Sequence, residues 1–150
     1  MATQEIGTNF KENIFKAWQK LIWGFFQKPK NNLDPKVAED IAKIKHSTII
    51  LLFQFFFVLY GEAKGVLDFK NYFNLRNYSF HQLKLEIAEE KYKYSLGTTL
   101  WYKLKGVFSL INRGSESLYP YEGDLFNPAK NQNLKEWEIE DSYLSDAIDL

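Results

Sequence analysis

The sequence predicts an all-α fold, an irregular bundle of about five helices around a long apolar central helix, with one long ordered loop. Apolar residues recur at helical spacing in segments separated by proline and glycine, and no segment shows the strict alternation of a half-buried strand. Of the 150 residues, 45% are hydrophobic and 17% aromatic, which suffices for one buried core. We therefore expect a single helical domain over residues 1–150.

The first helix is expected to begin at Asn9 and to end before Pro29. Asn9 and Glu12 have the spacing of a capping-box variant, and a proline followed by polar residues stops a helix. The apolar residues that form its stripe are Phe10, Ile14, Trp18, Leu21, Ile22 and Phe25.

The central helix is expected from Pro35 to about Lys64. Asp34 supplies a cap just before a proline at the first helical position, and Gly65 favours a stop. The run Ile49–Tyr60 is almost entirely apolar. Its 12 residues are fewer than the roughly 20 that cross a bilayer, so we predict a buried core helix and no membrane span.

Two shorter helices are expected next. Ser79 is a cap for one of them, and the other runs from about Thr99 to Asn112 and ends at Gly114. The apolar positions are Phe80, Leu83, Ile87 and Ala88 in the former and Leu100, Trp101, Leu104, Val107, Phe108 and Ile111 in the latter.

Residues 115–133 form the expected loop, because prolines, glycine and asparagines within it favour turns. A further helix is expected to begin at Trp137 and to continue to Leu150. Its apolar side consists of Tyr143, Leu144, Ala147 and Ile148. Since nothing in the sequence completes that side, we expect it to be exposed and the chain to be part of a longer protein.

The charge balance argues against recognition of DNA bases by this chain. The formal net charge is +0, from 19 basic and 19 acidic residues. Only Arg76 and Arg113 are arginines, and arginine is the usual reader of guanine edges. Cysteine is absent and the first ten residues lack the pattern of a signal peptide, which together predict a cytoplasmic location.

A nuclease site is considered at Glu62 and Lys64, with Asp34 or Asp40 as a second carboxylate. Such sites normally place Glu-x-Lys on a strand, whereas this pair closes a helix, so solvated helix-end residues are the favoured interpretation. The two histidines, His46 and His81, lie far apart and have no metal-ligand spacing. We therefore assign no catalytic residue, no cofactor-binding residue and no metal ligand.

Four lysines near tyrosines are the candidates for nucleic-acid contact, as in some proteins that bind single strands. They are Lys91, Lys93, Lys103 and Lys105. A solvated helix end with amphipathic tyrosines is the competing interpretation.

Three phrases in order resemble one enzyme family. Leu51–Leu67 resembles the "leucine-rich helix, Tyr-Ala-Glu, two residues, Gly-Leu-Leu" phrase of large type IIG-like restriction–modification DNA methyltransferases, which include phage-exclusion methylases. Leu100–Phe108 is similar to the family's next tryptophan-containing helix. Tyr119–Asn127, with the helix Trp137–Leu150, resembles its Tyr-x-Gly-x-Leu-Phe turn and the helix after it. Gly61 departs from the family, where alanine is more usual, and this bears on whether the long helix continues there.

The resemblance implies a helical spacer region N-terminal to the methyltransferase domain. The family transfers a methyl group from S-adenosylmethionine to adenine in DNA, and many members also cleave DNA. The glycine-rich cofactor motif and the Asn-Pro-Pro-aromatic motif are absent from this sequence, so the resemblance carries no catalytic residue over. It implies the methyltransferase domain of the same protein as the partner, contact with DNA through that protein, and no cofactor in this chain.

A second interpretation is a free-standing helical interaction module without enzyme activity. Its docking surface would be the apolar side of the last helix, from Tyr143 to Ile148, which could bind a partner or a second copy of the chain. The sequence leaves both interpretations open.

Overall fold

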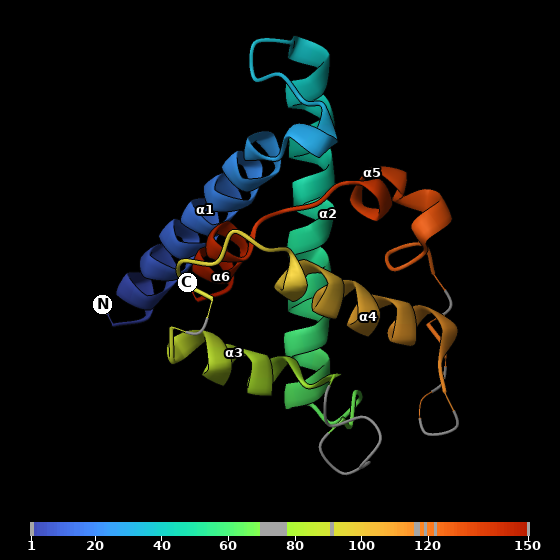
Figure 1. Ribbon diagram of the computed structural model, residues 1–150. Coiled ribbons are helices and arrows are strands. Elements are labelled where there is room, and N and C mark those ends of the chain that lie inside the picture. Colours follow the sequence, from blue (N-terminus) through green and yellow to red (C-terminus); the bar gives the residue numbers. More distant parts are fainter. Residues whose placement is uncertain are drawn as a thin grey trace.

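The computed structural model describes residues 2–69, 78–90, 92–115, 118, 120–121 and 123–149, without the side chains of residues 2–8. Within these ranges the protein is all-α, as predicted. The helices are α1 (Ala2–Gln27), η1 (Pro29–Asn31), α2 (Ala38–Ala63), α3 (Phe80–Ala88), α4 (Thr99–Arg113), η3 (Pro128–Lys130), α5 (Gln132–Glu136) and α6 (Asp141–Asp149). Figure 1 shows α2 as the long upright helix, with α1 on one side of it and α5 on the other.

The predicted starts of the first two long helices were wrong. Helix α1 begins at Ala2, so Asn9 lies inside the helix and is no cap. Helix α2 begins at Ala38 instead of Pro35. The reason is local, since Asp34 Oδ1 accepts from the Lys36 amide at 2.9 Å and closes a turn that holds the proline outside the helix.

The end of α2 agrees with the sequence prediction. The helix ends at Ala63, and Gly65 has a φ of +78°, a conformation that favours glycine. Helix α2 also continues through Gly61 without a break. A Cβ at Gly61 would lie 2.8 Å from Leu67 Cδ1, so the close return of the chain at Leu67 explains why glycine stands there.

Aromatic rings join the helices into one core. Phe25 of α1 packs edge-on against Trp101 of α4 with ring centroids 5.5 Å apart. Phe55 of α2 lies 5.7 Å from Phe80 of α3 and 6.3 Å from Phe108 of α4. Helix α2 therefore packs against both α3 and α4, as its apolar sequence predicts.

Helix α3 begins directly after the predicted cap, Ser79, and Glu62 acts as a second cap. The Ser79 hydroxyl accepts from the Gln82 amide at 3.3 Å. Glu62 Oε2, at the end of α2, accepts from the amides of Phe80 and His81 at 2.9 and 3.1 Å. A carboxylate at a helix N-terminus is stabilising, so this contact fixes α3 against the end of α2.

The last helix differs from the prediction in its start and in its exposure. It begins at Asp141, after an extended segment from Trp137. Leu144 is fully buried, and Ala147 and Ile148 are only 5% and 6% exposed, because α6 packs along α1. The expected exposed face from Tyr143 to Ile148 is thus mostly inside the core.

Helix α2 is the one described helix with the length and composition to cross a membrane. The core helix of a soluble protein passes the same test, and 39% of the most apolar window of α2 is buried against the rest of the chain. The window also contains Gln54, whose side chain is buried and donates to the Leu125 carbonyl oxygen at 2.8 Å.

Candidate functional site

Two of the four lysine candidates form ion pairs with glutamates in the structure. Lys93 pairs with Glu90, and Lys103 pairs with Glu86, each at 3.3 Å. Lys105 donates to the Lys135 carbonyl oxygen at 2.6 Å, and Lys91 lies outside the described residues. Two of the three described candidates are thus partly neutralised, and their contact with nucleic acid stays a prediction.

Lys105 lies instead beside a polar cluster that the sequence did not reveal. Glu138 accepts from Lys30 at 2.7 Å and from the Tyr102 hydroxyl at 2.5 Å. These two hydrogen bonds, that from Lys30 first, hold the pKa of Glu138 below its ordinary value. Partial burial lowers the pKa of Lys105. The partners of Glu138 are more than 30 residues away in sequence, so no local pattern could have indicated them.

The carboxylates of the considered nuclease site do not come together. Asp40, near the start of α2, accepts a hydrogen bond of 3.0 Å from the Asp34 amide. Glu62, near the end of α2, caps the N-terminus of α3. Glu62 follows Asp40 by 22 positions, which corresponds to roughly 33 Å at the helical rise. No group of three or more metal-ligating side chains exists among the described residues, so this part of the chain offers no preformed metal site.

The segments that carry the family resemblance meet in one packing unit. Phe57, from the leucine-rich helix phrase, packs edge-on against both Tyr121 and Phe126 of the turn, at 5.1 Å in each case. Phe126 also lies 5.5 Å from Phe108, in the tryptophan-containing phrase. A Cβ at Gly123 would be 2.8 Å from the Tyr121 ring, which explains the glycine within this turn. Tyr119 and Glu122 lie outside the described residues.

The outer stripe of α2 is the largest feature that the sequence analysis missed. We define it as Ile49, Phe53, Phe56 and Tyr60, which are 39%, 57%, 36% and 66% exposed. Steps of four, three and four residues place them on one face of the helix. Scattered exposed apolar residues are normal on a protein, but a contiguous row marks an interaction surface. An apolar run gives no clue to which of its faces stays open, and this is why the stripe was not predicted.

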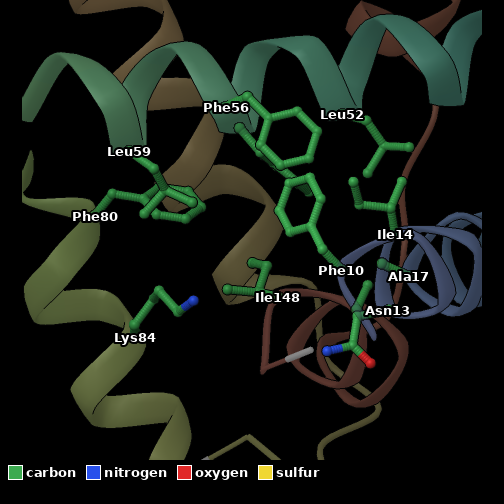
Figure 2. Close-up of a pocket in the computed structure, with 12 residues that line it drawn as sticks. Phe10, Asn13, Ile14, Ala17, Leu52, Phe56, Leu59, Phe80, Lys84 and Ile148 are labelled. Carbon is green, nitrogen blue, oxygen red and sulfur yellow. The ribbon is translucent and has the colours of Figure 1, made fainter. Parts of the chain in front are cut away.

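The stripe borders a small apolar pocket between α1, α2, α3 and α6. Figure 2 shows Phe10 of α1 facing Phe56 of α2, with Lys84 of α3 across the pocket. The rings of Phe10 and Phe56 lie 6.2 Å apart, and the pocket has a volume of about 180 Å³. Apolar side chains make most of its wall, which suits an apolar group and offers no reactive chemistry.

Comparisons of the sequence and the structure with known proteins found no match. No protein-family model matches the chain, no curated protein is similar to it, and no solved structure resembles it. The family resemblance therefore depends on the phrases of the sequence alone.

Proposed function

We propose that this chain is the non-catalytic helical scaffold region of a restriction–modification DNA methyltransferase. The observation that carries the proposal is the outer stripe of α2, an exposed and mostly aromatic row on the central helix of the fold. Three of its members, Phe53, Phe56 and Tyr60, belong to the phrase that resembles the family. The methyltransferase domain of the same protein would dock on this stripe, and S-adenosylmethionine and DNA would bind to that domain.

The packing unit of the turn supports this proposal. The resembling phrases are separated by up to about 70 residues, yet Phe57 and Phe126 touch and Gln54 binds the turn backbone. Phrases that serve one structural unit are expected to meet in this way. The turn packs on Phe57, which adjoins the stripe because it lies four residues after Phe53 and three before Tyr60. The four side chains of the stripe are nevertheless exposed with the turn in place.

The structure removes the exposed face on which the interpretation as a free-standing interaction module depended. That face was expected from Tyr143 to Ile148, and the structure buries Leu144, Ala147 and Ile148. Self-association through the stripe is the form of this interpretation that remains. It predicts a dimer of the 150-residue chain in analytical ultracentrifugation that Phe53→Glu disrupts.

The proposal is tested by methyl transfer and by the reading frame after Leu150. The purified 150-residue chain, incubated with labelled S-adenosylmethionine and duplex DNA, should transfer no label, while the complete protein should methylate adenine. The frame should encode a glycine-rich cofactor motif and an Asn-Pro-Pro-aromatic motif. Methylation by the 150-residue chain alone, or a complete protein without those motifs, would refute the proposal.

A further inference from the structure

A second pocket lies on the far side of the core, between α4 and the segment that contains η3 and α5. Its volume is about 250 Å³, and its apolar wall is made of Trp101, Phe108, Phe126 and Leu134. These four side chains are at most 7% exposed, so the wall is part of the rigid core. An apolar cavity of about 150 Å³ holds a benzene ring, and the space here therefore suits a fused pair of rings.

The charge around this pocket has one sign. Lys105 and Lys135 are the charged side chains among its lining residues, all of which the structure describes, and no carboxylate lines it. The Lys105 amine uses one donor on the Lys135 carbonyl oxygen and has two further N–H groups. Its amine also lies over the Trp101 and Tyr102 rings, 5.6 and 5.3 Å from their centroids, which fixes the amine near the aromatic wall.

A ligand that matches both features must be flat, apolar and negatively charged at one end. Glu138 is the carboxylate that acts electrostatically on Lys105, and it already accepts hydrogen bonds from Lys30 and Tyr102. A bound anion would thus meet an amine without a carboxylate of its own at hydrogen-bond distance. The partial burial that lowers the Lys105 pKa would be offset by such an anion.

We propose that the pocket between α4 and α5 binds a small aromatic carboxylate, with the ring system against Trp101 and Phe126 and the carboxylate on Lys105. The site is independent of the proposed docking on the outer stripe of α2, which lies on another face of that helix. A free aromatic acid and an aromatic acid attached to a larger molecule share this chemistry.

The probe is 2-naphthoate, added to the complete 150-residue chain labelled with ¹⁵N. We expect a Kd of about 1 mM or tighter, the affinity that a ligand of this size reaches at ordinary efficiency. The amide signals that shift at saturation should be those of residues 105–109 and 126–135. The matched cation 2-naphthylmethylammonium should bind at least tenfold more weakly.

Two variants and a control locate the site. Lys105→Met keeps the apolar stem and removes the charge, so affinity for 2-naphthoate should fall about fivefold to tenfold, the loss of one charge-assisted hydrogen bond. Ser109→Phe, at an exposed position on the rim, should block entry and abolish binding while the fold is kept. Lys43→Met, in an exposed pair with Glu39, should change affinity less than twofold.

Several results would overturn the proposal. They are no binding at 5 mM 2-naphthoate, equal affinity for the cation, unchanged affinity in both Lys105→Met and Ser109→Phe, and shifts confined to the pocket at Phe10 and Phe56. A fall in affinity that is equal in Lys43→Met and Lys105→Met would show a general charge effect and would count against the site as well.

Discussion

The buried Gln54 side chain donates a hydrogen bond of 2.8 Å to the carbonyl oxygen of Leu125, 71 residues later in the chain. Gln54 is the polar residue within the apolar run of α2. A buried amide without a partner is costly, so the turn at Leu125 makes this polar residue compatible with the core. In return, the hydrogen bond positions the turn whose Tyr121 and Phe126 rings pack on α2.

Phe126 should be the main anchor of that turn. It is 3% exposed and packs against Phe57, Phe108 and Tyr121. We expect Phe126→Ala to lower the free energy of unfolding by about 3–5 kcal/mol, as for other buried phenylalanines. Urea denaturation followed by circular dichroism measures this. Tyr94→Ala, at a side chain that is 83% exposed, is the control and should stay within about 0.5 kcal/mol of the wild type.

Two helical glycines should respond to alanine in opposite directions. A Cβ at Gly24 of α1 would clash with Ile139 Cδ1 and would lie 2.8 Å from Tyr143 Cβ, whereas a Cβ at Gly106 of α4 would meet nothing closer than 4.0 Å. Gly24→Ala should destabilise by about 1–3 kcal/mol through overpacking. Gly106→Ala should stabilise by roughly 0.5–1 kcal/mol, because alanine favours the helix. Thermal unfolding of both variants tests this, and a stabilising Gly24→Ala would show that α1 and α6 are less closely packed than described.

The Asp141 carboxylate should stabilise the start of α4. Its oxygens accept from the Leu100 amide and from the Ser95 hydroxyl, both at 2.8 Å, and the residue is 2% exposed. We expect Asp141→Ala to cost roughly 1–3 kcal/mol of unfolding free energy, since it leaves these donors without a partner. Asp149→Ala, on the same helix but exposed, should have almost no effect. Equal effects of the two variants would refute this role of Asp141.

Acid should weaken the contact between Glu138 and its two donors. Hydrogen bonds from Lys30 and Tyr102 hold the Glu138 pKa below its ordinary value of 4.5. The unfolded chain therefore takes up this proton first as the pH falls. The stabilisation is fully present above pH 4.5 and is lost as the pH falls through the lowered pKa of the folded state.

The measurement compares the free energy of unfolding of the wild type and Glu138→Gln between pH 3 and pH 7. The wild type should be the more stable protein near neutrality, and the difference should shrink below pH 4.5. A difference that does not change with pH would mean that the charge of Glu138 contributes nothing.

The sequence was sufficient for the fold class and for features that depend on neighbouring residues. Helical spacing predicted α1 to α4, and Ser79 and Gly65 marked boundaries that the structure has. The start of α6 could not be predicted in this way, because its position depends on Asp141 binding Leu100 from a distant part of the chain. The same holds for exposure. An apolar side at residues 143–148 predicted a free surface, but its partner is α1, at the other end of the sequence.

The most direct test of the scaffold proposal is binding of this chain to the proposed methyltransferase domain, expressed separately. Isothermal titration calorimetry should show a complex with the wild type. Phe53→Glu and Tyr60→Glu should each weaken it at least tenfold, and Tyr94→Glu, exposed but outside the outer stripe of α2, should leave it unchanged. Absence of any complex, or equal binding by wild type and Phe53→Glu, would contradict the proposal that the stripe is the docking surface.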